Sequence, residues 1–365
     1  MEVESEGLSE VLSSLHALIL PEQQSKIFNI PELDILLPSS TPPLLQPLQQ
    51  HPRSDDDIWD PNQQRQTEAF RPAAPSREKK KTIRPVLELV SPSPAYHPSP
   101  AGKTSLIHLI ITHAILPASL STIPLSGLDA AVILFDPLHH FSTAFLATTL
   151  FSHTISRFQE GEKDIHDEAT KKEIHQCIKR SLSHVHIFRP SSWDSLLSTL
   201  RQLPDYLFSP HRHTSTHRAI HSIILEDIDA FVPAIRGTSS FSNPQANPLS
   251  TASSQLTLQL ENLATLLSCA VVSTSRSTSS TSFRAALPLS WPPRMQLTRL
   301  AVRRMETVKF APGISVEEAE QERAQRWGVV SRGRFEAWKV GQGPRESEAF
   351  VFTVGRSVQI EQGLE

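Results

Sequence analysis

The distribution of hydrophobic and polar residues between 85 and 365 predicts strands that alternate with helices. Five short apolar runs have the composition of buried strands, namely 86–90, 130–136, 185–188, 223–227 and 269–273. Apolar residues recur at helical spacing over 104–116, 141–158, 193–208 and 255–267. This alternation predicts an α/β fold with a mostly parallel central sheet. Further strands, expected at 297–303, 329–338 and 349–360, would form a C-terminal antiparallel extension.

The N-terminal part follows a different pattern. Residues 8–20 place Leu8, Leu12, Leu15 and Ile19 on one stripe, which predicts a short amphipathic helix in an N-terminal segment 1–37. Because so short a helix is marginal in water, it must bury this stripe on the body of the protein or on a partner. Residues 38–84 are rich in Pro, Gln, Ser and charged residues, which predicts a disordered linker.

Residues 85–365 then form the predicted folded domain, with flexible loops expected at 232–254 and 274–284, which are rich in Ser.

The amino-acid composition limits the class of protein in three ways. The 29 prolines, 12 glycines and 38% hydrophobic residues agree with a chain that is partly linker. A net charge of −3 excludes a strongly basic protein, so any nucleic-acid surface must be local. Cys177 and Cys269 lie far apart in apolar settings, which favours buried thiols in a reducing compartment.

Two targeting features follow from the same reading. No apolar run reaches the length of about 18 residues that a membrane span requires, so we expect no membrane association. The basic cluster Lys79-Lys80-Lys81 could act as a nuclear-import signal, although short lysine runs are also common as solvated surface.

The stretch Gly102-Lys103-Thr104-Ser105 carries the clearest chemistry, since it lies between the first predicted strand and its helix. In a phosphate-binding loop, backbone N–H groups at the helix start hold phosphates, the lysine neutralises them and the Thr hydroxyl binds Mg²⁺. His97 stands where the full motif has its first glycine, and four prolines occupy the loop, Pro92, Pro94, Pro98 and Pro100. Because proline lacks the N–H that holds phosphate, the loop predicts only weak binding of ATP and Mg²⁺.

Carboxylates follow two of the predicted strands. Asp136 ends one apolar run, and Glu226 and Asp227 end another. Ligands of parallel sheets lie beyond the carboxyl ends of the strands, so we expect these three acids near Lys103. Thr104 and Glu226 are the candidate Mg²⁺ ligands. The alternative is that acids at strand ends cap the next helix or face solvent.

The histidines suggest less. His211, His213, His217 and His221 resemble a metal cluster, but they lack cysteine partners and an established spacing, which favours a surface loop. His139 and His140 lie where a catalytic group could act, although the position favours an ordinary pair at a helix N-terminus.

The order of these motifs resembles the RecA-type recombinase paralogues of homologous recombination over about residues 86–360. The residues that carry the resemblance are Leu87-Glu88-Leu89, Gly102-Lys103-Thr104, Leu109, Ile115-Leu116-Pro117, Phe135-Asp136, His140-Phe141, Ile224-Leu225-Glu226, Ala230-Phe231, Trp291, Arg299, Val330-Ser331-Arg332 and the 350–358 strand. The resemblance implies a RecA-like P-loop domain that acts in DNA double-strand-break repair in the nucleus. It also implies a heteromer with other RecA-type recombinase paralogues, and contact with single-stranded or branched DNA through that complex.

This sequence departs from the family pattern at several positions. Related recombinases carry a catalytic glutamate two residues after the aspartate that corresponds to Asp136, and here Leu138 stands there, which cannot accept a proton. The family's second-motif aspartate falls on Glu226, and residues 273–276 replace the expected γ-phosphate sensor. The loop at 232–254, which usually faces DNA in the family, offers only Arg236 and Phe241 for it.

Three interpretations therefore stay open. The first is a recombinase-paralogue adaptor with weak nucleotide binding, no catalytic residue and no efficient hydrolysis. The second is an active P-loop enzyme, either a DNA-dependent ATPase or a small-molecule kinase. The third is a nucleotide-binding scaffold unrelated to DNA.

Overall fold

The computed structural model of this protein describes most of the predicted folded domain and a short N-terminal piece. The described residues are 27–37, 84–93, 101–162, 165, 167–237, 247–279, 283–305, 315–331, 333–341 and 349–361. The predicted helix at 8–20, the linker up to residue 83, and three of the loop prolines, Pro94, Pro98 and Pro100, lie outside them.

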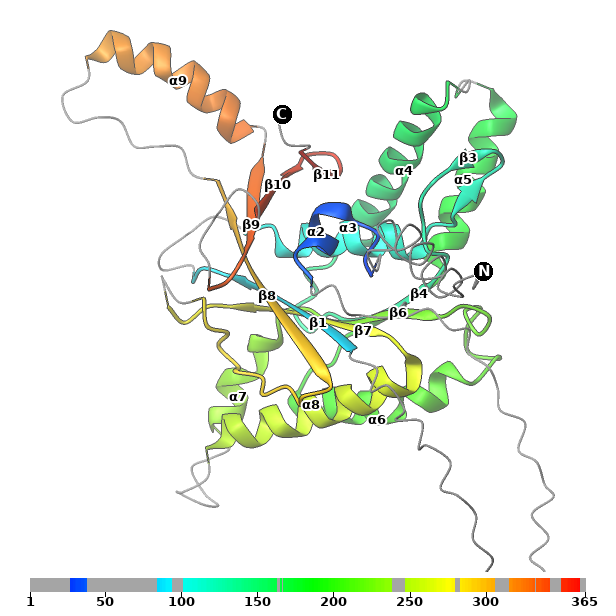
Figure 1. Ribbon diagram of the computed structural model, residues 1–365, viewed down its shortest axis with the longest axis vertical. Coiled ribbons are helices and arrows are strands. Elements are labelled where there is room, and N and C mark those ends of the chain that lie inside the picture. Colours follow the sequence, from blue (N-terminus) through cyan, green and yellow to red (C-terminus); the bar gives the residue numbers. More distant parts are fainter. Residues whose placement is uncertain are drawn as a thin grey trace, which may run out of the picture.

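The described part of the chain is α/β and is built on a mostly parallel central sheet (Figure 1). The strands are β1 (Arg84–Ser91), β4 (Ala131–Phe135), β5 (Val185–Phe188), β6 (Ile220–Leu225), β7 (Ala270–Arg276), β8 (Met295–Arg304), β9 (Arg334–Lys339), β10 (Ala349–Val354) and β11 (Val358–Ile360). Their order across the sheet is β11-β10-β9-β8-β1-β7-β6-β4-β5. The pairs from β8 to β5 are parallel, and those from β8 to β11 are antiparallel. A separate two-stranded hairpin joins β2 (Ser119–Leu120) and β3 (Ile123–Pro124).

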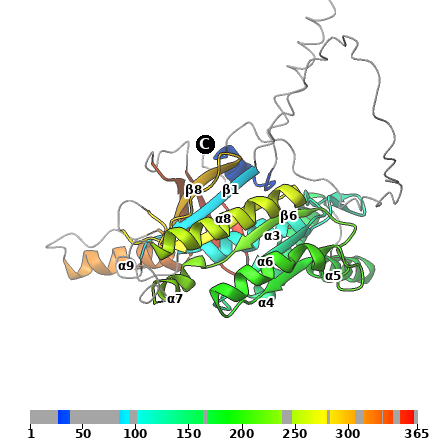
Figure 2. The same cartoon turned by 90° about the horizontal axis from the view of Figure 1, so that it is seen from below.

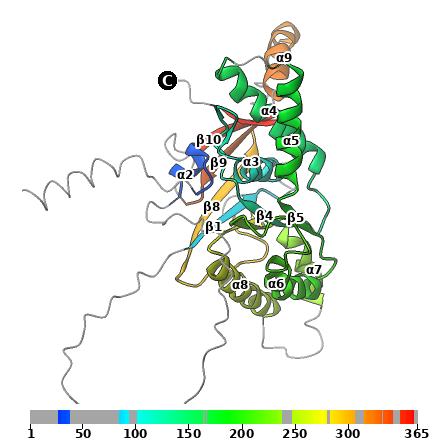
Figure 3. The same ribbon diagram turned by 90° about the vertical axis from the view of Figure 1, so that its right-hand side faces the viewer.

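Helices cover both faces of this sheet. On one face lie α3 (Lys103–Ile115), α4 (Thr143–Glu160) and α5 (Glu168–Leu182), and on the other α6 (Trp193–Leu207), α7 (Val232–Gly237) and α8 (Pro248–Leu267) (Figures 2 and 3). Successive residues of a strand point to opposite faces, so Leu87 and Leu89 of β1 pack with α3 while Val86 packs with the opposite layer. The continuous apolar runs in the sequence thus reflect strands that are buried on both sides.

Residues 27–37 pack against the body of the protein. They contain the short helix α2 (Pro31–Ile35), which lies close to α3 in Figure 1. Phe28, Ile30 and Leu33 are buried in the core that α3 shares, and His221 of β6 hydrogen-bonds to the Ile27 carbonyl oxygen at 2.9 Å. This end of the predicted segment 1–37 is therefore part of the folded body.

The parallel α/β core was predicted correctly, but the structure corrects several element predictions. β8 pairs in parallel with β1, whereas the sequence interpretation placed 297–303 in the antiparallel extension. Residues 316–331 form helix α9 (Val316–Ser331), so the strand predicted at 329–338 begins only at Arg334. The segment 349–360 is a hairpin of β10 and β11.

The predicted loops are also shorter than expected. Residues 232–237 are α7, and α8 begins at Pro248, so 248–254 are helical. The Asn247 side chain caps α8 by accepting from the Leu249 N–H at 3.1 Å, and Pro248 suits the first helical position. Residues 274–276 belong to β7. Segments that were predicted to be loops because they are rich in serine therefore contain a capped helix and the end of a strand.

Candidate functional site

The candidate site lies at the carboxyl edge of the parallel strands. β1, β7, β6 and β4 are neighbours in the sheet and run in the same direction, so their ends meet at one edge. Ser91 ends β1, Asp136 follows β4, and Glu226 and Asp227 follow β6. Helix α3 begins with Lys103 directly after Gly102. The strand–loop–helix arrangement that the sequence predicted around Lys103 is present.

Lys103 is almost completely buried at the start of α3. Its Nζ donates to Ser91 Oγ at 2.7 Å and lies 4.0 Å from Asp227 Oδ1. Burial lowers the pKa of Lys103, and the nearby Asp227 carboxylate opposes that shift. The ammonium group thus already has a hydrogen-bond acceptor and a counter-charge. A phosphate that bound here would have to compete with both of them.

Thr104 and Glu226 are in direct contact. The Thr104 hydroxyl donates a short hydrogen bond to Glu226 Oε1, and Glu226 Oε2 is buried without a hydrogen-bond partner among the described residues. Burial raises the pKa of Glu226 to about 7, and the neighbouring Asp227 and Asp136 carboxylates add to the increase. Glu226 Oε2 and the Thr104 hydroxyl oxygen are thus two neighbouring oxygen atoms, and oxygen atoms are the ligands that Mg²⁺ prefers.

Asp227 connects the two sides of the site. Its φ is +45°, in the left-handed region, and its N–H donates to Thr274 Oγ1 of β7 at 2.8 Å. Its Oδ2 lies 2.7 Å from His140 Nδ1, while Oδ1 faces Lys103. The hydrogen bond to β7 thus holds Asp227 in an unfavourable backbone conformation, which is typical of residues at functional sites.

Asp136 has a different role from the other acids. It is fully buried and accepts the His140 N–H at 2.9 Å, with Arg189 Nε 3.7 Å away. These contacts hold the turn after β4, and the cap of the next helix is Ser142. Leu138 lies in the same turn and is 39% exposed. Asp136 is thus a structural carboxylate next to the site.

Gly102 is required where α3 begins. Its φ is +83°, and a Cβ at this position would lie 2.6 Å from Phe335 Cδ1 of β9. We expect Gly102→Ala to lower the free energy of unfolding by about 2 kcal/mol, because an alanine pays for the left-handed backbone and meets the ring. Urea denaturation followed by circular dichroism measures this change.

Gly355→Ala is the matched control, because a Cβ there meets nothing within 4 Å and its φ is not left-handed. Equal stability of the two variants would contradict the assigned role of Gly102.

The structure therefore brings together Lys103, Thr104, Glu226 and Asp227, with Asp136 and Gly102 beside them. Ser105 is half-buried in the first turn of α3 and, within the described part of the chain, forms no hydrogen bond with these groups. Sequence reasoning missed three contributors, Ser91, Thr274 and the Asp227 contact of His140. Their position at or just after strand ends was the available signal, since polar side chains there face the same edge.

Among the described residues, the four histidines between 211 and 221 are not arranged as a metal site. His221 is buried inside β6, so the interpretation of all four as a surface loop was wrong for this residue. His140 lies two residues before the N-cap Ser142 of α4 and also faces Asp227, a contact that the sequence did not indicate. In the described residues, no group of three or more His, Cys, Asp or Glu side chains is arranged to hold a metal ion.

Comparison with known proteins gives no family assignment, because no protein-family model matches this sequence and no curated protein matches it either. Within the described parts of the chain, no helix is both long enough and apolar enough to span a membrane.

Proposed function

We propose that this protein is a RecA-type recombinase paralogue that acts as an adaptor in homologous recombination repair of DNA double-strand breaks. The observation that carries the proposal is the position of Lys103 and Thr104 at the start of α3, facing Glu226 and Asp227 across the edge of a parallel sheet. A RecA-like P-loop domain needs this constellation. The fold alone is compatible with many functions, so the ordered motifs supply the rest of the argument.

The resemblance gives the proposal its finer content. The motif order resembles in particular a fungal version of X-ray repair cross-complementing protein 2. It implies a nuclear protein that contacts other recombinase paralogues and reaches single-stranded or branched DNA through their complex. The isolated subunit offers little cationic surface in 232–254, so we expect weak autonomous binding to single-stranded DNA.

Lys103, Thr104 and Glu226 would hold ATP and Mg²⁺ in this proposal. The metal ion would neutralise charge on the phosphates, and the orphaned oxygen of Glu226 fits such a role. Two features weaken the binding. Lys103 must exchange Ser91 and Asp227 for phosphate, and Glu226 must lose its proton near neutral pH. The site therefore suits occasional nucleotide binding better than rapid turnover.

We expect the purified protein to show no steady-state ATP hydrolysis above background, because Leu138 can neither accept a proton nor orient a water. Phosphate release is measured for the wild type and for Lys103→Ala. Equal background rates are the expected result. Hydrolysis that disappears in Lys103→Ala would overturn the non-hydrolysing interpretation.

One observation favours the alternative of an active P-loop ATPase. His140 is oriented by Asp227 through a 2.7 Å contact at Nδ1, which leaves Nε2 available as a base. Should hydrolysis be found, its loss in His140→Gln with retained nucleotide binding would assign that role. The small-molecule kinase and the scaffold unrelated to DNA have no comparable observation in their favour.

The adaptor role is tested by co-expression with the other RecA-type paralogues of the same organism, followed by size-exclusion chromatography. Co-elution with one of them is the expected outcome. A protein that stays monomeric and stable with each of them would remove the adaptor proposal, whatever its nucleotide chemistry.

A further inference from the structure

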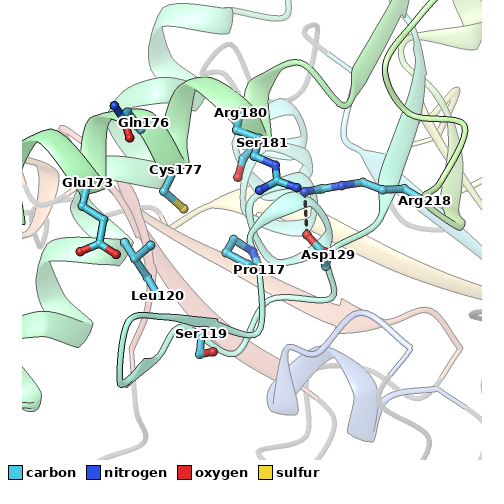
Figure 4. A pocket seen from close by; sticks show the side chains of 10 residues that line it. All are labelled: Pro117, Ser119, Leu120, Asp129, Glu173, Gln176, Cys177, Arg180, Ser181 and Arg218. Atoms are coloured by element: carbon cyan, nitrogen blue, oxygen red, sulfur yellow. Dashed lines mark ion pairs between the residues drawn. The ribbon is translucent and has the colours of Figure 1, made fainter.

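A cavity of about 360 Å³ lies at the amino ends of the strands, on the opposite edge of the sheet from the candidate site. One wall is the face of α5 that carries Glu173, Cys177 and Arg180 (Figure 4). The opposite wall contains Asp129, which precedes β4, and Arg218, which precedes β6. Since β4 has 5 residues, it separates the two edges by about 17 Å at 3.3 Å per residue. The cavity is thus distinct from the Lys103 site.

Arg218 is a buried cation whose donors are not all used. It is 4% exposed, and its guanidinium donates to the carbonyl oxygens of Ile115 and Ala130 and to Asp129 Oδ1 at 2.6 Å. Its Nε is buried and has no hydrogen-bond partner among the described residues. Leaving a donor of a buried charged group unpaired is unfavourable, so an acceptor at this position would be stabilising.

A second guanidinium lies near the first. Figure 4 shows Arg180 on α5 extending toward Arg218. Burial lowers the pKa of Arg218, the Asp129 carboxylate opposes this shift, and the charge of Arg180 adds to it. Arg180 forms no ion pair with any other described residue, so Asp129 is the one carboxylate paired with this couple. Two neighbouring guanidinium groups, of which only Arg218 is paired with a carboxylate, make a site for an additional anion.

The other end of the cavity has the opposite character. Glu173 lies there, and it already accepts a hydrogen bond from the Ser121 hydroxyl at 2.6 Å. Gln176 lines the same wall, and Leu120 and Pro117 contribute apolar surface (Figure 4). A cavity of this size, with mixed walls and polar groups at its two ends, has the dimensions of a small-molecule site.

We propose that this cavity binds a small organic anion, whose carboxylate or phosphate group lies between Arg180 and Arg218 and whose other end reaches Glu173 and Gln176. In this proposal Arg218 contacts the anion from the wall that precedes β6, and Arg180 contacts it from the wall that α5 forms. The ligand class follows from the unpaired guanidinium donors and not from the nucleotide site, so either site can bind without the other.

Cys177 provides the measurement, because it lines the cavity and the chain has only one other cysteine. Cys269 is completely buried at the start of β7 and serves as an unreactive reference. The full-length protein is treated with neutral iodoacetamide in inorganic phosphate, in acetate, or in chloride of equal ionic strength. Mass spectrometry of the Cys177 peptide then gives the alkylation rate.

We expect phosphate or acetate to slow alkylation of Cys177 relative to chloride, by about tenfold when the anion is at ten times its Kd, since only the unoccupied fraction reacts. The stronger of the two anions identifies the group that the cavity prefers. Arg180→Gln should abolish the protection, and its exposed position on α5 makes correct folding the expected outcome.

Lys179→Gln is the matched control, because Lys179 is an exposed neighbour that does not line the cavity. It should keep the protection. Equal alkylation rates in all three salts, or protection that persists in Arg180→Gln, would overturn the proposal.

Discussion

The free energy of unfolding should fall by about 3 kcal/mol per pH unit as the pH is lowered from about 6 to about 5. Burial lowers the pKa of six histidines, which are His108, His113, His153, His184, His186 and His221. In the unfolded chain these imidazoles take up protons below about pH 6.5, whereas in the folded protein each takes up its proton only at a lower pH. Each therefore contributes stability above this pH that is lost as the pH falls toward its folded pKa.

Buried carboxyls work in the opposite direction. Burial raises the pKa of Asp34 to about 6 and of Glu226 to about 7, and it also raises those of Glu88 and Asp229. Asp34 and Glu226 therefore take up protons on folding in the same pH range, so acid favours the folded state through them. The four histidines whose pKa falls to about 3 or about 4, namely His113, His184, His186 and His221, minus the two carboxyls Asp34 and Glu226 leave a net of about two protons. At 1.36 kcal/mol per proton and pH unit this gives the expected slope of about 3 kcal/mol.

Urea denaturation at several pH values, followed by tryptophan fluorescence, measures this slope. His113 has its pKa lowered to about 3, so His113→Phe should reduce the slope by about 1.4 kcal/mol per pH unit. His211 is exposed, and His211→Gln should leave the slope unchanged. A stability independent of pH in this range would contradict the neutral state of the buried histidines.

Glu226→Gln should stabilise the protein at alkaline pH, in spite of its place in the candidate site. The pKa of Glu226 rises on folding from 4.5 to about 7, so ionising the buried carboxyl costs about 3 kcal/mol above that pH. Its contribution to stability is complete below about pH 4.5 and is lost as the pH rises through about 7. The neutral amide avoids that cost and still accepts the hydrogen bond from Thr104.

The expected gain is therefore about 3 kcal/mol at about pH 8 and under about 1 kcal/mol at about pH 5, where the folded wild type is already protonated. Denaturation of both proteins at the two pH values gives the difference. Asp205→Asn, at an exposed position of α6, is the control for removal of a surface carboxylate. A gain of the same size at both pH values would show that packing, and not ionisation, is responsible.

The same variant connects stability with function. A carboxyl group that is buried at a cost in folding free energy is typical of a binding site, because the free energy of ligand binding offsets that cost. If Glu226 holds Mg²⁺ with ATP, the two together should raise the melting temperature of the wild type more than that of Glu226→Gln.

Much of the core could be predicted because its strands and helices have recognisable local sequence patterns. Strand β4 is a continuous apolar run, and β1, β6 and β7 contain shorter apolar runs, as is typical of strands buried on both faces. Gly102-Lys103-Thr104 could be recognised because the motif requires a strand before it and a helix after it, and both have clear periodicity. The helix α9 was missed because its residues are charged and carry no apolar stripe.

The direction of β8 depended on information that no local pattern contains. An apolar strand pairs equally well in either direction, and the position of β8 beside β1 selects the parallel pairing. Ser and Thr in 248–254 were interpreted as loop residues, yet their side chains also bond within a helix, as Ser254 does to the Ser250 carbonyl at 3.0 Å. Tertiary packing of Ala252 and Leu256 decides between these states.

The sequence by itself therefore determined the α/β core, the strand–loop–helix around Lys103 and the carboxylates at its edge, because each depends on neighbours in the chain. Only the tertiary structure decided what each side chain touches. His140 reaches Asp227 across 87 positions, and Arg218 reaches Ile115 across 103. Such contacts decide which acid holds a turn, which acid pairs with a lysine, and which cation keeps an unpaired donor. They depend on distances in space, because charge and burial act between atoms that are close together in the folded chain.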